Sequence, residues 1–564
     1  MFRRNSGGRA LSALLLLSTL LPFAVPARAA SVSKAEISAY ADRLLAEAYP
    51  ADEPGAAAIV VLDGEVVLRK GYGLANVELQ VPNGPEMVFE LGSVTKQFTA
   101  AAILMLAERG QLRIEDDVTK YLPDYPTHGQ KITIEHLLTH TSGIPSYTGL
   151  PEWIPRVREE MKLETLIGLF KDKPLEFTPG KRWAYNNSAY VLLGAVIEKA
   201  SGKSYEQFIE EEVFKPLGMK DSRYGHAAEL VSRRAYGYGR DGENWKNADY
   251  LSMTQPYAAG SLLSTVDDLV LWDKALSGGT LLRKASLDRM FTAVKLNSGQ
   301  STRYGYGWAV FDWEGRRIVE HGGDIFGFTS YVSRVPQERL FIAILSNNEA
   351  SDPRPEAIVA RIQGKIFGSP LEDRKPLPLA AREMDEYVGV YRFDEETTRT
   401  ITRDGDKLFS RRSGGGKAEI KAFAKDSFYF EESDSRLRFR RDAQGKITGV
   451  DFSPRYGLEG FGKRTDEPIP DERQAVKVDP AVYDGLVGEY ELAPGFTLTI
   501  TREGGQLFGT PTGQPKSELY PESESRFFLK VVDAQIDFER GPDGKATGLV
   551  LHQGGRDVPG KRVR

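Results

Sequence analysis

The sequence predicts an α/β (α+β) domain, in which helices flank an antiparallel sheet, followed by two all-β barrel domains. Three observations support this architecture. Long helical patterns alternate with short apolar runs as far as residue 368, Pro-rich linkers occupy residues 369–380 and 466–480, and the segment after the first linker recurs after the second. At 564 residues the chain is also too long for a single hydrophobic core.

The composition is that of a globular protein, with 41% hydrophobic and 27% charged residues. The formal net charge is -5, and no basic tract stands out beyond the first ten residues, so we expect no nucleic-acid partner. The chain has no cysteine. Its folded state must therefore rest on packing rather than on disulfide bonds.

The first 29 residues have the pattern of a cleaved export signal. Three arginines precede the apolar run "ALSALLLLSTLLPFAV", and Ala27-Arg28-Ala29 offers small residues at the spacing that a signal peptidase needs. An uncleaved membrane anchor is the alternative, but the run is shorter than the usual span of about 20 residues and contains Pro22. We therefore predict a signal peptide at residues 1–29, a periplasmic or secreted protein, and no stable membrane insertion after cleavage.

Residues 30–368 are expected to form the first domain. Two apolar runs around Asp63-Gly64 in "AAAIVVLDGEVVLRKGYG" indicate a β-hairpin. The stretch "SVTKQFTAAAILMLAERG" has a helical apolar stripe that starts at Ser93 and ends at Gly110. Four later segments, "YGYGWAVFDW", "RIVEHGG", "GFTSYVSRVP" and "RLFIAILSNN", are separated by Gly, Pro and Asn and predict consecutive antiparallel strands.

The region after residue 380 contains the same unit twice. "YVGVYRF" matches "LVGEYEL", and "ITRDGDKLFSR" matches "ITREGGQLFGT". Gly389 and Gly488, like Leu408 and Leu507, are 99 residues apart, which indicates duplicated domains. Short alternating runs between tight turns predict a small β-barrel at residues 381–465 and another at 480–564. A single continuous sheet is less consistent with copies that each begin after a linker.

The stretch "LGSVTKQFTA" places Ser93 three residues before Lys96. On a helix, side chains three apart lie on one face, about 5 to 6 Å apart at Cβ. A serine hydroxyl is a weak nucleophile unless a base takes its proton, and a lysine of lowered pKa can do so. The alternative is a helix cap, with Ser93 accepting a backbone N–H and Lys96 in water.

Two further stretches supply polar groups at the ends of predicted elements. "WAYNNSAYVLLG" places Tyr185 and Asn187 just before an amphipathic helix, and "VEHGGDIFG" places His321 at the end of a strand, followed by glycines that let a ligand approach the backbone. Alone, each has an ordinary structural explanation, such as a packed tyrosine with a satisfied hydroxyl. In this order after S-x-x-K, they favour a catalytic site.

The three motifs S-x-x-K, Y-x-N and H-x-G resemble those of the serine β-lactamase and penicillin-binding superfamily. The chain is most similar to the class C β-lactamase-related serine hydrolases of the peptidase S12 type, which include D-aminopeptidases, D-Ala-D-Ala carboxypeptidases and esterases. The stretches "LLTHTSGIP" (137–145) and "GSLLSTVDDLVLW" (260–272) also resemble this family. The likeness spans roughly residues 35–365 and implies a β-lactamase-like fold. The two repeats resemble the lipocalin-like barrels of D-aminopeptidase-like members.

The resemblance implies a role for each motif residue. Ser93 would attack a carbonyl to form an acyl-enzyme, and Lys96 and Tyr185 would share the work of the base. The nearby ammonium is expected to favour the phenolate form of Tyr185. Asn187 would orient Lys96 and the substrate amide. The backbone N–H groups of Ser93 and Asp324 would form the oxyanion hole, which is worth about 3 to 4 kcal/mol per donor where measured.

The chain departs from the β-lactamase pattern at the third motif. His321 stands where K-T-G has its lysine, and Gly323 follows as a substrate-binding position. An imidazole with a pKa near 6.5 is mostly neutral at pH 7, so a fixed positive charge for a substrate carboxylate is absent. We therefore expect hydrolysis of amide or peptide bonds in small peptides, including those with D-amino acids. Esterase, β-lactamase and D-Ala-D-Ala carboxypeptidase activities are alternatives, and a non-catalytic binder of peptidoglycan or protein is an alternative of another class.

The sequence contains no complete motif for a zinc site. His136 and His140 in "EHLLTH" are four residues apart, but Leu137 stands where the glutamate of H-E-x-x-H would be, so we interpret both as helix and turn residues. We expect no metal and no cofactor, and the sequence leaves the oligomeric state open. The barrel loops 410–419 and 509–518 form a further hypothesis: that they reach over the catalytic cleft and narrow it.

Overall fold

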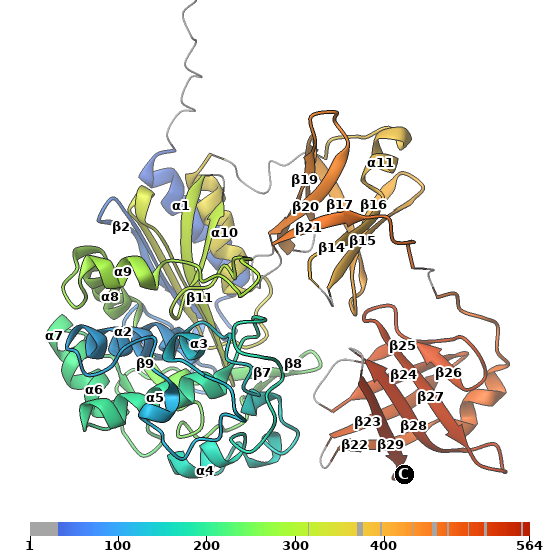
Figure 1. Ribbon diagram of the computed structural model, residues 1–564, viewed down its shortest axis with the longest axis horizontal. Helices are drawn as coiled ribbons and strands as arrows, with labels where there is room; N and C mark the ends of the chain where they lie inside the picture. Colours follow the sequence, from blue (N-terminus) through green and yellow to red (C-terminus); the bar gives the residue numbers. More distant parts are fainter. Residues whose placement is uncertain are drawn as a thin grey trace, which may run out of the picture.

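The computed structural model describes residues 32–313, 315–368, 376–394, 397–430, 433–453, 460–470, 473–493, 496–512, 516–553 and 556–564. The predicted signal segment 1–29 lies outside these ranges. Figure 1 shows an α/β domain on one side and two β-barrels on the other. No helix among the described residues is both long and apolar enough to cross a bilayer.

A six-stranded antiparallel sheet forms the centre of the first domain, in the order β10-β11-β12-β13-β1-β2. The hairpin predicted at Asp63-Gly64 and the four predicted consecutive strands are confirmed by the register of this sheet. β13, late in the chain, pairs with β1, near its start, and so joins the N-terminal hairpin to the four later strands. The strands are β1 (Ala56–Leu62), β2 (Glu65–Tyr72), β10 (Ala309–Trp313), β11 (Arg316–Ile325), β12 (Phe328–Val335) and β13 (Leu340–Ser346).

Both faces of the central sheet are buried, which explains the continuous apolar run of β1. Successive side chains of a strand point to opposite faces. Ala58 and Val60 join a cluster with α1 (Lys34–Ala48) and α10 (Pro355–Ile366), while Ile59 and Val61 join the larger cluster that contains α2 and α8. The sheet is therefore the middle layer of three, as the ribbon shows (Figure 1).

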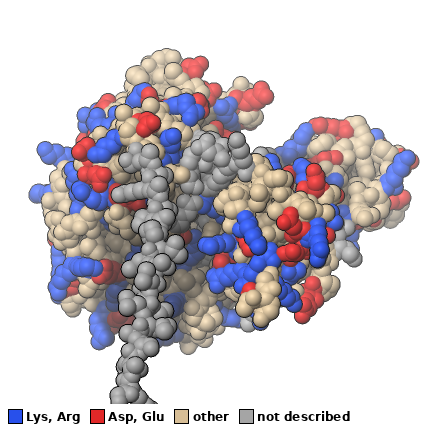
Figure 2. Space-filling view, turned by 90° about the horizontal axis from the view of Figure 1, so that it is seen from above, with Lys and Arg blue, Asp and Glu red and all other residues tan. Residues whose placement is uncertain are grey.

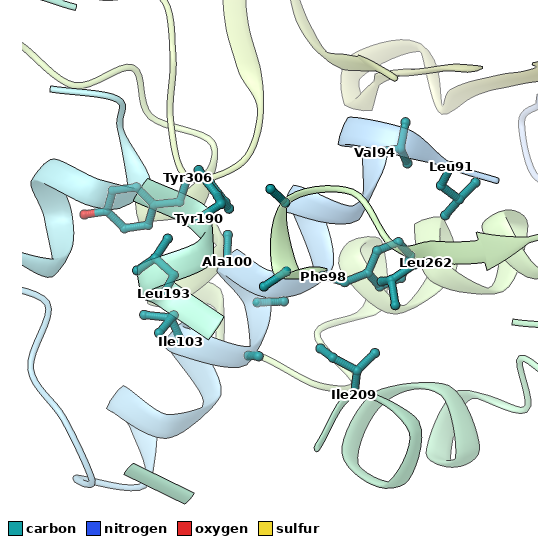
Figure 3. Close-up of a cluster of buried hydrophobic side chains, with 14 of the residues drawn as sticks. Leu91, Val94, Phe98, Ala100, Ile103, Tyr190, Leu193, Ile209, Leu262 and Tyr306 are labelled. Atoms are coloured by element: carbon teal, nitrogen blue, oxygen red, sulfur yellow. The ribbon is translucent and has the colours of Figure 1, made fainter. Parts of the chain in front are cut away.

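Helix α2 (Thr95–Glu108) runs through the larger cluster and is buried from Thr95 to Leu106. It begins two residues after Ser93, because Ser93 itself lies in a short 3-10 turn, Gly92–Val94. Phe98 stacks on Trp272 of α8 (Val266–Gly278), with ring centroids 4.4 Å apart. Figure 3 shows Phe98, Ala100 and Ile103 of α2 among side chains from α5 (Asn187–Ser201) and other elements.

Short elements surround α2 and α5. The helices are α3 (Ile134–Leu138), α4 (Leu163–Gly168), α6 (Tyr205–Ile209), α7 (Lys215–Leu217) and α9 (Lys284–Met290). Three small sheets pair β3 (Leu74–Asn76) with β4 (Val81–Pro82), β9 (Leu262–Ser264) with β5 (Phe89–Glu90) and β6 (Arg223–Tyr224), and β7 (Tyr238–Asp241) with β8 (Asn244–Asn247).

Each sequence repeat forms a closed eight-stranded antiparallel barrel. The duplication is visible in one hydrogen bond: the Tyr391 hydroxyl donates to Tyr387 O, and the equivalent Tyr490 hydroxyl donates to Leu486 O, both at 2.7 Å. Helix α11 (Ala381–Tyr387) precedes the first barrel. The strands of the first barrel are β14 (Gly389–Arg392), β15 (Thr398–Asp404), β16 (Lys407–Arg412), β17 (Lys417–Ala424), β18 (Ser427–Phe430), β19 (Ser433–Arg441), β20 (Ile447–Ser453) and β21 (Phe461–Thr465). Those of the second are β22 (Gly488–Ala493), β23 (Phe496–Glu503), β24 (Gln506–Pro511), β25 (Ser517–Pro521), β26 (Arg526–Phe528), β27 (Ala534–Arg540), β28 (Ala546–Gln553) and β29 (Arg556–Arg562).

The barrels contact their neighbours through single side chains and turns. The Arg436 guanidinium of β19 lies 4.4 Å from the centre of the Trp313 ring on β10. Gly415 in the 410–419 loop forms a bridge with Val532 of the second barrel, and Asp533 N–H donates to Gly414 O at 3.4 Å. Figure 2 shows both signs of charge interspersed over the face in view.

The stacked pair at the centre of the first domain gives a stability prediction. Phe98→Ala removes a fully buried ring from its contact with Trp272, so we expect the catalytic domain to lose about 3 to 5 kcal/mol of unfolding free energy. Differential scanning calorimetry should show a lower melting temperature for that domain alone. Val66→Ala, at a side chain that is 55% exposed, is the control and should change stability by less than about 0.5 kcal/mol. Equal effects of the two substitutions would contradict this account of the core.

Candidate active site

Ser93 lies in a turn that is packed tightly against β11. Gly92 has a φ of 52°, and a Cβ there would lie 3.1 Å from Asp324 N. A Cβ on Gly323 would lie 2.0 Å from Leu91 O and 3.0 Å from Ser93 N. Both positions therefore require glycine for the turn and the strand to approach. Gly323 thus packs against the Ser93 turn, and its expected contact with substrate stays a prediction.

The Lys96 side chain is fully buried and points its amine at three acceptors. Nζ lies 3.0 Å from Ser93 Oγ, 2.8 Å from Asn187 Oδ1 and 2.9 Å from Ala259 O. Burial holds the pKa of Lys96 well below its usual value near 10.5, because a charge without water is costly. A neutral amine has two N–H bonds and one lone pair. It can donate to Asn187 and Ala259 and accept the Ser93 proton.

Asn187 is fixed from both sides. Its Oδ1 accepts from Lys96, and its Nδ2 donates to Thr148 Oγ1 at 3.0 Å. Its backbone N–H donates to Ser146 Oγ at 3.1 Å. The amide orientation is therefore determined by a donor on one side and an acceptor on the other, and Asn187 positions the Lys96 amine.

Tyr185 borders both Ser93 and Lys96. The Lys96 amine lies 4.8 Å from the centre of the Tyr185 ring. Burial raises the pKa of Tyr185 above its usual value near 10, although a hydrogen bond with the Ser93 hydroxyl opposes this shift. The raised pKa favours the neutral phenol over the expected phenolate, even though the residue as a whole is 38% exposed, because the hydroxyl is the part that contacts Ser93. Tyr185 is a neutral phenol that can give a proton.

His321 is neutral, and both of its ring nitrogens are occupied. Nδ1 lies 2.6 Å from Gly322 O and donates to it, so Nε2 accepts from the Tyr304 hydroxyl at 2.8 Å. Burial, reinforced by Lys96, lowers the pKa of His321 from 6.5 to about 3. At neutral pH the position therefore carries no positive charge that could bind a carboxylate.

His140 is a member of the site that sequence reasoning assigned to turn structure. It is fully buried, accepts a hydrogen bond from Asn186 N–H at Nδ1 (3.1 Å), and its ring packs 4.4 Å from that of Tyr185. Tyr304 also packs against it, at 4.7 Å. His140 thus positions the Y-x-N segment, and the stretch "LLTHTSGIP" around it was the available signal. His136 does act in a helix cap, through Thr133.

The backbone N–H of Asp324 points away from β12. Ile325 and Phe328 are register partners across the two-residue turn Phe326-Gly327, so they form the hydrogen-bonded pair that closes the hairpin. Pairs alternate along an antiparallel ladder, so Asp324↔Thr329 is a non-hydrogen-bonded pair. On the other side, the β10 register ends at Ala309↔Glu320. The Asp324 N–H therefore faces the open edge of β11, next to the Ser93 turn.

A cavity of about 710 Å³ opens beside Ser93. Ser93, Asn187 and Asp324 line it, whereas Lys96, Tyr185, His321 and Gly323 do not. All described lining residues lie between 92 and 350, so the 410–419 loop, which contacts the second barrel, does not narrow it as hypothesised. Residues 513–515 of the other loop lie outside the described ranges. The remaining lining residues are Gly92, Tyr147, Thr148, Trp153, Arg240, Leu251, Pro256, Ala259, Gly260, Ile325, Phe326, Phe328, Glu349 and Ala350.

Comparison with known families agrees with this geometry. The family described as Beta-lactamase matches residues 42–364, which is more than half of the chain. The chain belongs to the Beta-lactamase family. It is a serine hydrolase of the β-lactamase and penicillin-binding superfamily. A second family, described as Domain of unknown function (DUF3471), matches twice, at residues 373–462 and 472–562.

Three similar proteins show how far the likeness of this family member extends. Penicillin-binding protein 4* of Bacillus subtilis (strain 168) is 31% identical over 519 residues, which cover 89% of this chain and 93% of that protein. The octameric penicillin-binding protein homologue from Pyrococcus abyssi is 28% identical, with a TM-score of 0.54, covering 76% of this chain and 99% of that one. The D-stereospecific amidohydrolase from Streptomyces sp. is 26% identical, with a TM-score of 0.50, covering 57% and 97%.

The pKa shifts predict which group governs the pH dependence of this Beta-lactamase family member. The rate of Ser93 labelling by a fluorophosphonate should rise with pH as Lys96 loses its proton, with a midpoint below 10.5. His321→Gln should leave that midpoint in place, because a histidine of pKa about 3 does not titrate above pH 5. Labelling rates between pH 4.5 and 10 test this. An inflection near 6.5 that disappears in His321→Gln would contradict it.

Proposed function

We propose that this serine hydrolase cleaves amide or peptide bonds of small peptides, including those of D-amino acids, through an acyl-enzyme. The observation that carries the proposal is the buried Lys96 amine, 3.0 Å from Ser93 Oγ and held by two other acceptors. A non-catalytic binder would have no use for a desolvated amine beside a hydroxyl, since burying it costs stability.

The reaction follows from the positions of the groups. Ser93 Oγ attacks the carbonyl carbon while its proton passes to Lys96, and the carbonyl oxygen becomes an oxyanion near the N–H groups of Ser93 and Asp324. The neutral Tyr185 phenol gives its proton to the leaving amine, and the C–N bond breaks. Lys96 then passes the proton that it took from Ser93 to the Tyr185 phenolate, which restores both groups to their neutral forms. A water molecule hydrolyses the acyl-enzyme by the same steps in reverse order.

The proposed substrate class is supported by the lack of a cation at residue 321. Because His321 is neutral and engaged by Tyr304, a C-terminal carboxylate finds no fixed cation at that position. This disfavours β-lactams and strict carboxypeptidase substrates. The likeness to a solved D-stereospecific amidohydrolase at 26% identity supports amides of D-amino acids as the first class to test.

The proposal includes the domain limits and the location. We place the hydrolase domain at residues 30–368 and the barrels at 381–465 and 480–564, and the family matches have similar limits. The arginines and the apolar run within residues 1–29 support export to the periplasm or beyond.

A panel of substrates tests the proposed activity. Purified protein is assayed side by side on D- and L-amino-acid p-nitroanilides, a D-Ala-D-Ala peptide, nitrocefin and a p-nitrophenyl ester. We expect the D-anilide to be turned over. Ser93→Ala should lower kcat/KM by at least about 10³-fold, because residues that act as one catalytic unit lose most of their effect when the nucleophile is removed.

The other outcomes are equally informative. Turnover of the ester alone would assign the protein to the esterases. Turnover of nitrocefin or the D-Ala-D-Ala peptide would show that the site accepts a substrate carboxylate despite the neutral His321. Failure of the folded protein to react with a fluorophosphonate would refute hydrolysis and favour a binding protein.

A further inference from the structure

The cavity beside Ser93 contains one carboxylate that is held by backbone rather than by a cation. Glu349, just after β13, lines the cavity, and its Oε2 accepts a hydrogen bond from Gly327 N–H at 2.6 Å. Among the described residues, no Lys, Arg or His nitrogen lies within ion-pair distance of it, and Oε1 has no hydrogen-bond donor. Glu349 is therefore a half-buried negative charge with one oxygen available.

The other charged residues of the cavity wall are already compensated. Asp324 forms an ion pair with Arg354. Arg240 lies 3.4 Å from Glu53 Oε2, donates to Glu243 O at 2.7 Å, and stacks 3.8 Å above the Trp245 ring. Unlike Asp324 and Arg240, Glu349 has no oppositely charged partner among the described residues, so its charge is available to a ligand.

Two glycines seat this carboxylate. A Cβ on Gly239 of β7 would lie 2.2 Å from Glu349 Oε1, so a larger residue there would displace the side chain. Gly327 has a φ of 81°, which lets its N–H reach Oε2 at the tip of the β11–β12 hairpin. The position of the carboxylate is therefore built into the backbone of two separate hairpins.

The chain length between Asp324 and Gly327 sets an upper limit on the distance from the oxyanion donor to the hairpin tip that holds the carboxylate. Asp324, whose N–H faces the oxyanion, is three residues before Gly327, so at most about 10 Å of chain separates them. Trp153, Phe326 and Phe328 also line the cavity. Aromatic rings and a carboxylate together are suited to an organic cation.

We propose that Glu349 binds an alkylammonium group of the substrate that is separated from the scissile carbonyl by the length of one or two residues. The inference rests on the proposed amide hydrolase function and deepens it. Two sources carry this chemistry: the side-chain ammonium of a lysine-like residue that supplies the carbonyl, or the free N-terminus of a short peptide.

The first experiment compares matched amides. D-lysine p-nitroanilide and D-norleucine p-nitroanilide differ by one charged group at the same chain length. We expect the wild-type protein to favour the lysine compound by at least about tenfold in kcat/KM, since a hydrogen bond between charged groups contributes that much. Glu349→Gln, which keeps an oxygen for Gly327 N–H, should abolish the preference while leaving norleucine turnover unchanged.

The second experiment separates the two sources. D-Ala-D-norleucine p-nitroanilide is compared with its N-acetyl derivative, again in wild type and Glu349→Gln. A preference for the free amine that depends on Glu349 identifies the N-terminal ammonium, and dependence in the lysine pair alone identifies the side chain. Glu164→Gln makes the same charge change at an exposed residue of α4 that does not line the cavity and should leave every preference intact.

The outcomes distinguish this inference from the function on which it rests. If the neutral norleucine compound is hydrolysed but neither pair shows a preference that Glu349→Gln removes, the role of Glu349 is refuted and the hydrolase stands. If no anilide is hydrolysed and Ser93 is not labelled by a fluorophosphonate, both are refuted.

Discussion

The burial of one amine is the constraint on which this active site depends. Lys96 is completely enclosed, with the rings of Tyr185 and Tyr190 at 4.8 and 5.4 Å from its nitrogen. A Cβ on Gly307 would come within 2.6 Å of Lys96 O, so the chain also packs closely against the backbone of α2 at this residue. Because a buried charge is costly, the amine is driven towards its neutral form. The packing of α2 thus lowers the pKa of Lys96 and lets its amine act as a base.

The same desolvation sets the state of the neighbouring groups. It raises the pKa of Tyr185 and lowers that of His321, so both are neutral when the amine is neutral. A site composed of neutral groups moves one proton along a chain of hydrogen bonds without creating a separated charge before the substrate arrives. It also means that recognition of a charged substrate group depends on other residues of the cavity wall, such as Glu349.

Local patterns in the sequence predicted what depends on local structure. The hairpin at Asp63-Gly64 and the four consecutive strands were predictable because apolar alternation and turn residues are local signals. The Ser93–Lys96 pair was predictable because both residues share one turn of chain. The duplicated barrels were visible from the repeat itself, and closure of each into eight strands is confirmed.

What escaped prediction depends on contacts between distant segments. His140 and Asn186 are 46 residues apart in sequence. The local sequence around each residue does not predict the hydrogen bond between them. The raised pKa of Tyr185 opposes the phenolate expected from the sequence, because a sequence shows a neighbouring charge but not the loss of water around a hydroxyl. The contact of the 410–419 loop with Val532 likewise depends on how two barrels meet. The central shortcoming is physical: a sequence reveals which groups can interact, whereas desolvation, which decides their protonation here, exists only once the chain has packed.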